Sequence, residues 1–317
     1  MVRRSEVVYR QHVRLQRLLA YVKPRSPFWR SVLATRAPAL AELPILDAAD
    51  EAKAFDDLNT VGLRRRDVEA VIRGVGPLRR GDVPLGAYAV RPNPGGLLVI
   101  DVRERALQLG ALMARLLPSS LLGSGQDRVA LLSRPPIALP RFVEWVTPQR
   151  LRCLGVPQRD PLSVQLARLR ELAPTLIVGG SRRLLPVAER WGHEGPRRPV
   201  QRVVSLAETL SVDHASVLEA GFGIPHVDRL YRADEGLYGQ TCAYGRLHLN
   251  EDLVIVERAW IDRKQGTYHP IVTDLFRTTL PRIRVRLADV LTDLPGPCPC
   301  GSPLRAVARI DRIDAQA

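Results

Sequence analysis

The sequence predicts an α/β protein with two parts: N-terminal helices and a layered α/β core over residues 1–240, and a small β-rich subdomain over residues 241–317. Short apolar strands alternate with amphipathic helices from residue 128 to residue 231, and such alternation forms a layered sheet with ligand sites at the carboxyl ends of its strands. Beyond residue 240 the expected strands follow one another without helices, which predicts the second part.

The N-terminal region is predicted to be helical. Residues 5–22 place apolar side chains near one face of a helix, namely those of Val8, Leu15, Leu18, Leu19 and Val22. Ser26 and Asp47 precede two further helical stretches, and residues 64–73 form another. Residues 85–90 and 96–101 then predict two short strands around a Pro/Gly turn, followed by an amphipathic helix over residues 103–117.

The remaining elements follow in order. Strands are expected at residues 128–132, 151–156, 175–180, 201–206 and 226–231, and the helices between them at residues 138–146, 161–172, 181–191 and 212–222. Five consecutive strands follow, at residues 245–249, 253–261, 268–275, 282–287 and 305–310.

Three of the four cysteines fall, together with His248, in the stretch from Tyr231 to Gly301. Cys242 and His248 are six positions apart, and Cys298 and Cys300 form a C-x-C pair. This set of three thiols and one imidazole suits a tetrahedral structural zinc ion. Cysteines arranged as metal ligands favour a reducing cytoplasm over a disulfide scaffold. The remaining cysteine, Cys153, is interpreted as a small buried hydrophobic residue.

Charge and hydropathy exclude several classes of protein. The net charge is +14, but the basic residues are scattered along the chain and aromatic residues make up only 5%, so no dedicated nucleic-acid role is predicted. No segment offers the ~20 uninterrupted apolar residues of a membrane span. Charges interrupt the apolar residues of the N-terminus, so it is not expected to be a secretory signal.

Several segments together resemble a known family. They are RSPFWRSVL at residues 25–33, LAELPILD at 40–47, FDDLNTVGLRRRDVEA at 55–70, TCAYGRLHLNEDLVIVE at 241–257 and PCPCGSPL at 297–304. They resemble the adenylate-forming superfamily, in the branch of phenylacetate–coenzyme A ligases and CapK-like adenylyltransferases (coenzyme F-three-ninety synthetase-related). The resemblance covers residues ~25 to ~310. It implies that both predicted parts form one large adenylate-forming domain.

The resemblance also implies roles for individual residues. Tyr231 corresponds to the aromatic residue that stacks on adenine, and the segment containing Ser205 and Glu208 passes the adenine. Glu235 corresponds to the carboxylate that holds Mg²⁺ near the phosphates of ATP. Asp274 corresponds to the acid that accepts the ribose hydroxyls. Arg284, or its strand neighbour Arg286, corresponds to the arginine on the ribose–phosphate side, and Asp289 to the acid before the hinge.

For the metal, Cys242, His248, Cys298 and Cys300 match the family's zinc ligands.

The chain departs from the family in three places. The family's phosphate loop is rich in Ser, Thr and Gly, whereas residues 86–96 read GAYAVRPNPGG, in which Pro92 and Pro94 lack N–H donors. Asp234 replaces the threonine before the magnesium-binding glutamate. The sequence stops at Ala317, near the hinge, so the C-terminal lid with its catalytic lysine is expected to be absent, and a partner protein or an arginine would have to replace it.

Two functions are compatible with this pattern. The first is a divergent enzyme that activates or handles a carboxylic acid in a specialised biosynthetic pathway, by acyl-adenylate chemistry or a derived acyl transfer or condensation. Retention of Glu235, Asp274 and Arg284 favours it. The second is a non-catalytic descendant that binds a ligand or partner protein through the old pocket, which the altered phosphate loop and missing lid favour.

Overall fold

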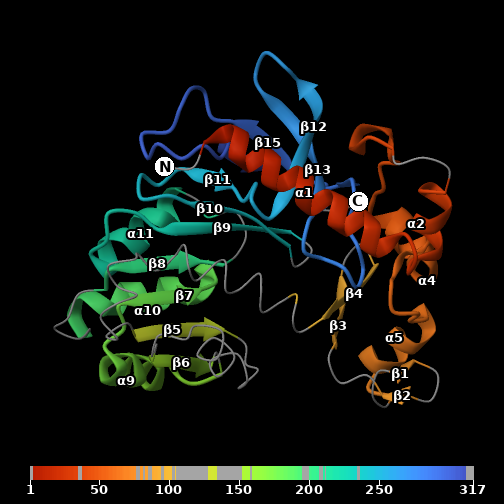
Figure 1. The fold of residues 1–317 in the computed structure, drawn as a ribbon. Helices are drawn as coiled ribbons and strands as arrows, with labels where there is room; N and C mark the ends of the chain where they lie inside the picture. The colour runs from red at the N-terminus through yellow and green to blue at the C-terminus, as the bar shows by residue number, and fades with distance from the viewer. Residues whose placement is uncertain are drawn as a thin grey trace. The chain divides into compact units, whose positions relative to one another are not determined.

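The computed structural model describes residues 3–34, 38–75, 79–80, 83–84, 88–93, 96–101, 104, 128–133, 152–157, 159–194, 200–206, 210, 212–233 and 236–311 (Figure 1). Contacts between Cα atoms divide the chain into two compact units. Unit 1 comprises Met1–Arg105, Ala233–Tyr238 and Leu249–Ala317, and unit 2 comprises Ala106–Arg232 and Gly239–His248. This partition differs from the boundary at residue 240, which stays a prediction.

Unit 2 is built on a parallel sheet. Its strands are β5 (Arg128–Ser133), β6 (Arg152–Pro157), β7 (Leu176–Gly179), β8 (Arg202–Ser205) and β9 (Asp228–Ala233), in the order β6-β5-β7-β8-β9. In register, Val129 pairs with Leu176 and Ile177 with Val203. The four residues of β7 are all buried, as expected for a central strand of a parallel sheet.

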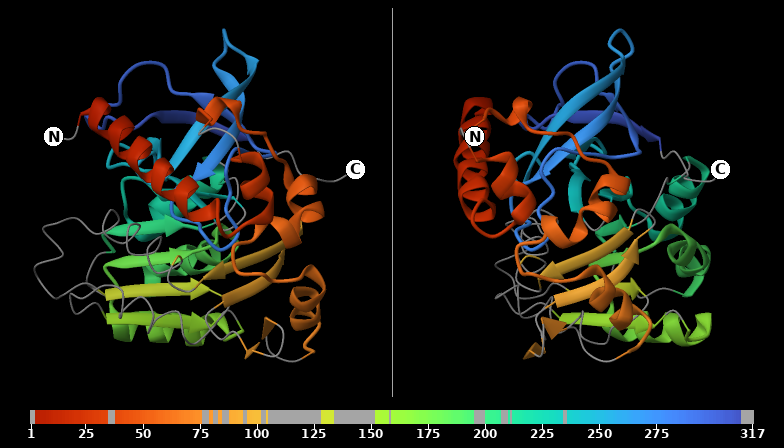
Figure 2. Two further views of the ribbon diagram at one scale, coloured as in Figure 1. Left: turned by 45° about the vertical axis from the view of Figure 1, so that its right-hand side comes forward. Right: turned by 90° about the vertical axis from the view of Figure 1, so that its right-hand side faces the viewer.

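Helices α9 (Leu162–Leu172), α10 (Ser181–Glu194) and α11 (Val212–Phe222) lie on one face of this sheet, as the right-hand view of Figure 2 shows. Their apolar faces join the strands in one core that includes Leu166, Trp191 and Phe222. A Cβ atom at Gly221 would come within 2.4 Å of the Ala188 carbonyl oxygen, so the contact between α10 and α11 requires glycine there.

Unit 1 contains an antiparallel sheet in the order β12-β13-β15-β16, with β14 paired to β13. Its strands are β12 (Val254–Asp262), β13 (Thr267–Asp274), β14 (Val285–Arg286), β15 (Val290–Asp293) and β16 (Ala306–Asp311). The strands β10 (Gly236–Thr241) and β11 (Leu247–Leu249) carry the chain between the two units. β12 and β13 pair along most of their length, from Val254 with Asp274 to Asp262 with Thr267.

The N-terminal helices form as their capping residues predict. In α1 (Arg4–Val22), Val7, Leu15, Leu18, Leu19 and Val22 are buried. Val8 is 50% exposed, so its expected place on the apolar face was wrong and Val7 occupies it. The Ser26 hydroxyl accepts a hydrogen bond from the Trp29 N–H at the start of α2 (Pro27–Val32).

Further helices of unit 1 follow η1 (Leu40–Glu42). Asp47 caps α3 (Ala48–Lys53) through the N–H groups of Ala49 and Asp50, and α4 (Phe55–Leu58) and α5 (Arg65–Ile72) complete the set. Two antiparallel strand pairs come next. They are β1 (Arg79–Arg80) with β2 (Val83–Pro84), and β3 (Tyr88–Asn93) with β4 (Gly96–Asp101).

The described elements confirm most of the predicted order of strands and helices. The helices expected at residues 138–146 and at most of 103–117 lie outside the described residues. Four strands were missed: the two-residue strands β1 and β2, and the longer β10 and β15. β10 reads GLYGQT, and its two glycines and polar residues hide the alternation on which strand prediction depends.

Candidate functional site

The four predicted metal ligands lie together. Cys242 follows β10 and His248 lies in β11, whereas Cys298 and Cys300 lie in the segment between β15 and β16. The three sulfur atoms and one ring nitrogen are all within 4.8 Å of one another. His248 and Cys298 are buried, and the other two are half-buried. All four cysteines of the chain are free of disulfide bonds.

Local turns present these sulfur atoms. Gly245 N–H donates to the Cys242 carbonyl at 2.9 Å, and Gly301 N–H donates to the Cys298 carbonyl at 3.1 Å. Both glycines have a positive φ, of 68° and 70°, a backbone conformation that residues with a side chain rarely adopt. The Ser302 N–H points to Cys300 Sγ at 3.4 Å, a contact that stabilises a thiolate. Three thiols and an imidazole at these separations fit a tetrahedral zinc ion, which would tie these segments together as a structural cross-link.

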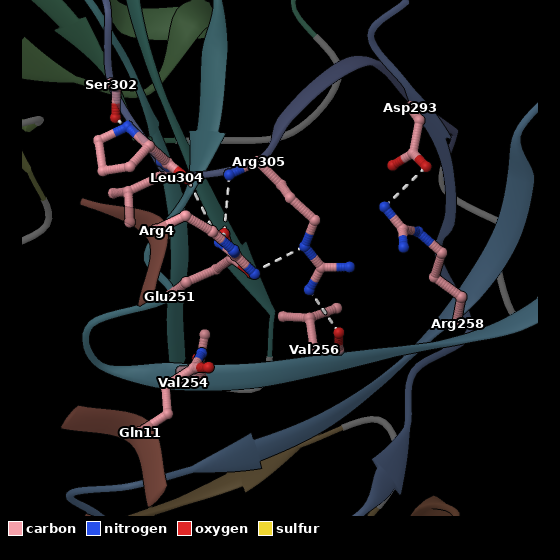
Figure 3. A network of polar contacts seen from close by, with 11 residues as sticks. Arg4, Gln11, Glu251, Val254, Val256, Arg258, Asp293, Ser302, Leu304 and Arg305 are labelled. Atoms are coloured by element: carbon pink, nitrogen blue, oxygen red, sulfur yellow. Dashed lines mark hydrogen bonds and ion pairs between the residues drawn. The ribbon is translucent and has the colours of Figure 1, made fainter. Parts of the chain in front are cut away.

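A buried carboxylate lies next to the loop that carries Cys298 and Cys300 (Figure 3). The side chain of Glu251 is fully buried and accepts hydrogen bonds from the backbone and side chain of Arg305, both at 2.7 Å, and from Arg4 of α1 at 2.8 Å. Burial alone would raise the pKa of Glu251, but the bonds from Arg4 and the charge of Arg305 outweigh it and lower the pKa. The network therefore holds an ionised carboxylate.

Asp274 ends strand β13 and is 2% exposed. One carboxylate oxygen accepts the Phe276 N–H at 3.0 Å, and its own N–H donates to the Arg282 carbonyl at 2.9 Å. Burial raises the pKa of Asp274, and the nearby Arg277 guanidinium opposes that shift. Asp274 is therefore a buried carboxyl group with a perturbed pKa. Such groups are typical of functional sites and are also found in structural networks.

Glu104 fixes the loop that follows Asp274. One oxygen of this buried carboxylate accepts the N–H groups of Thr278 and Thr279, at 2.8 and 2.7 Å, and both hydroxyl groups as well. On the other side of the loop, the Thr60 hydroxyl donates to the Thr278 carbonyl at 2.7 Å. The sequence interpretation missed this carboxylate, because nothing in its sequence neighbourhood points to a partner 174 residues away.

The two candidate arginines, Arg286 in β14 and Arg284 directly before it, differ in exposure and in their contacts. Arg284 is 8% exposed and has a positive φ of 54°. Its guanidinium pairs with both oxygens of Glu257, at 2.9 and 3.0 Å, and donates to the carbonyls of Ala41 and Leu43. Arg286 is exposed, and its backbone N–H donates to the Leu46 carbonyl. Arg284 thus has most of its five donors engaged within the protein.

The remaining predicted nucleotide contacts belong to the other unit or to undescribed residues. Ser205 ends β8 and is 1% exposed, and Tyr231 lies in β9 and is 5% exposed. Both therefore lie toward the carboxyl ends of parallel strands, where such sheets bind ligands. Glu208 and Glu235 lie outside the described residues.

Comparison with known proteins identifies the fold. No family model matches the chain, and no curated protein matches it in sequence. Among solved structures, the open conformation of 2-hydroxyisobutyryl-CoA ligase in complex with 2-HIB-AMP and CoA matches with a TM-score of 0.69 and 15% identity, covering 98% of this chain and 70% of that chain. The same ligase in its postadenylation state with 2-HIB-AMP matches with a TM-score of 0.67 and 15% identity, over 98% and 68%.

A more distant match is coronafacic acid ligase from Pectobacterium brasiliense, with a TM-score of 0.48 and 10% identity, covering 73% of this chain and 48% of that chain. The 2-hydroxyisobutyryl-CoA ligase structures show that this chain shares the mixed α/β fold of that ligase. The likeness does not distinguish the phenylacetate–coenzyme A ligase and CapK branch from others. No helix among the described residues has the length and apolar character to span a membrane.

Proposed function

We propose that this chain binds an adenylate and activates or handles a carboxylic acid, as part of a specialised biosynthetic pathway. The observation that carries the proposal is the match over 98% of the chain to a ligase whose structure holds an acyl adenylate and CoA. The order in which the resemblance places the nucleotide contacts Ser205, Tyr231, Asp274 and Arg286, along β8, β9, β13 and β14, supports it. The phenylacetate–coenzyme A ligase and CapK branch, and a location in the cytoplasm, belong to the same proposal.

The chemistry follows from the charges involved. A carboxylate oxygen of the acid attacks the α-phosphorus of ATP, an acyl–phosphate bond forms, and the bond to pyrophosphate breaks. Such a step depends on positioning and on neutralising negative charge. We assign the charge-stabilising role beside the phosphate to Arg286 rather than Arg284, because Arg286 is exposed whereas Arg284 is bound to Glu257. Asp274 would accept the ribose hydroxyls, and Glu235 would hold Mg²⁺.

The zinc ion belongs to the proposal as a structural element. Cys242, His248, Cys298 and Cys300 would hold it, and its chemistry would be to cross-link segments that lie far apart in the sequence. It takes no part in the acyl step, because a site with four protein ligands has no open position for substrate.

A thermal shift experiment tests the nucleotide site. AMP or Mg²⁺–ATP is expected to raise the Tm of the purified chain, since a ligand that binds only the folded state stabilises it. The Asp274→Asn variant should lose this shift, and Arg286→Gln should reduce it. A shift of unchanged size in Asp274→Asn would refute the assignment of Asp274.

One observation favours the second function, a non-catalytic binding protein. β3 and β4 pair from Tyr88 with Asp101 to Asn93 with Gly96, so only two residues separate the paired strands. Residues 88–93 and 96–101 therefore form a strand pair, and Pro92 in β3 has no N–H group to offer a triphosphate. In that case AMP or an acyl adenylate would bind, but ATP would bind no more tightly than AMP.

A further inference from the structure

The loop that presents Cys298 and Cys300 is anchored at both ends. At its start, the Leu294 N–H donates to the Ala306 carbonyl at 3.0 Å. At its end, the backbone and side chain of Arg305 donate to the two oxygens of Glu251, and the Leu249 N–H donates to the Arg305 carbonyl at 2.8 Å. One buried carboxylate therefore accepts two of the three hydrogen bonds of the second anchor.

That carboxylate also receives a cation from the other end of the chain. Both terminal nitrogens of Arg4 contact Glu251, one of them at 2.8 Å, and one also donates to the Pro303 carbonyl at 3.3 Å (Figure 3). The Glu251 side chain is 1% exposed, whereas that of Arg4 is 45% exposed. A carboxylate buried to this extent needs its cations, because an unpaired buried charge is strongly destabilising.

Further contacts fix helix α1 against the same segment. The Gln11 amide donates to the Val254 carbonyl at 2.9 Å, and the Arg14 guanidinium donates to the Asp252 carbonyl. Gln11 is 8% exposed, so its bond lies at a buried contact. Helix α1 thus contacts the residues just after β11 through three separate side chains, and it contacts the end of the cysteine loop through Arg4.

We propose that Glu251 is a positioning residue for the metal cluster: it joins the Cys298–Cys300 loop to helix α1, so that binding of zinc and docking of α1 stabilise each other. The inference rests on the proposed zinc site and adds a coupling that the ligands alone do not imply. Linkage requires that the effect run in both directions: zinc should stabilise the docked α1, and the contacts made by α1 should tighten zinc binding, which is expected to appear as slower release of zinc.

The rate of zinc release tests one direction. The zinc-loaded full chain is mixed with 4-(2-pyridylazo)resorcinol, which absorbs visible light when it takes up zinc. Glu251→Gln and Arg4→Gln are expected to release zinc about tenfold faster than the unchanged chain, within the range found when groups behind metal ligands are removed. Arg10→Gln is the matched control, because Arg10 is on the same helix and, among the described residues, its one ion pair is with the exposed Glu6. Its release rate should stay within about twofold, since it does not contact the loop.

Hydrogen exchange tests the other direction. Removing zinc with the chelator should speed amide exchange in α1 about tenfold in the unchanged chain, and by much less in Arg4→Gln, where the connection is already broken. If Glu251→Gln does not fold, Arg4→Gln alone decides the question, because its side chain is partly exposed and its loss is tolerated more easily. Equal zinc release from Arg4→Gln and Arg10→Gln, with α1 exchange insensitive to zinc, would overturn the coupling while leaving the zinc proposal intact. A chain that binds no zinc would overturn both.

Discussion

The parallel sheet of unit 2 and the antiparallel sheet of unit 1 bury very different groups. Around β5, β7 and β8 the core is a continuous apolar cluster of strand and helix residues. Around β13 and β14, by contrast, the buried side chains include Asp274, Arg277, Arg282 and Arg284. Buried charges have a large desolvation cost and persist where they are paired or functional. Among the described residues, the sheet of unit 2 packs mainly on apolar side chains, with Asp228 of β9 as a buried acid, whereas several buried charged side chains gather around β13 and β14 of unit 1.

The largest expected effect is loss of the metal cluster. Cys298→Ser should abolish binding of one equivalent of zinc and should lower the Tm by more than about 10 °C, because metal binding energy contributes directly to folding. Cys153→Ser is the matched control and should keep its zinc, since Cys153 lies in β6, outside the cluster. Metal analysis after dialysis and thermal melts measure both effects. Equal melting temperatures for the two variants would contradict the assignment.

A buried ion pair of unit 1 comes next. Both oxygens of Glu51 pair with Arg282, at 3.0 and 2.6 Å, and the Arg282 side chain is only 4% exposed. Glu51→Gln should destabilise the protein by about 3 kcal/mol, because it removes the charge of the carboxylate that pairs with both sides of a buried guanidinium. The control is Glu69→Gln, which breaks an exposed pair with Arg65 and should cost about 0.5 kcal/mol or less. Urea unfolding should distinguish the two variants. Similar losses of unfolding free energy would mean that burial does not determine how much each ion pair stabilises the fold.

The pH dependence of Glu251 gives a smaller effect. Its pKa in the folded protein is below its ordinary value of 4.5, so its ionised form stabilises the fold above that pH, and this contribution is lost as the pH falls through the lowered pKa. Glu251→Gln should therefore be less stable than the unchanged chain at pH 7, and the difference should shrink below pH 4.5. A difference that is constant from pH 7 to pH 3 would mean that packing, rather than charge, is lost.

The smallest expected change in stability is at Asp274, where the substitution should stabilise the protein rather than destabilise it. Burial raises the pKa of Asp274, so the folded protein binds a proton more readily than the unfolded chain, and stability falls as the pH rises above the ordinary value of 3.8. Asp274→Asn removes the buried charge and should raise stability at pH 7 by about 1 kcal/mol, while abolishing the response to AMP. A stabilising effect without loss of AMP binding would assign Asp274 to structure alone.

The difference between the two units also explains how far the sequence could be interpreted. In unit 2, the apolar runs at β5, β7 and β8 and the helices between them were predicted because burial imposes a regular pattern on neighbouring residues. The metal cluster was predicted because few other arrangements use three cysteines and a histidine in this way.

Long-range polar contacts were not predictable in the same way. The bond of Glu104 to Thr278, the pair of Glu51 with Arg282 and the contact of Arg4 with Glu251 each join residues more than 170 positions apart. Nothing local distinguishes such a carboxylate from a solvated one, since the pairing is set by the tertiary fold. For the same reason the sequence did not separate Arg284 from Arg286, and only the contacts of Arg284 with Glu257 did so.

The most direct test of the proposed function is ATP–pyrophosphate exchange with the purified, zinc-loaded chain against a panel of carboxylic acids. Exchange that depends on one class of acid, and that is lost in Asp274→Asn, is the result expected for a chain that forms acyl adenylates. No exchange with any acid, from a folded chain that binds zinc but gains no thermal stability from AMP, would contradict the account and leave a binding protein built on the fold of a ligase.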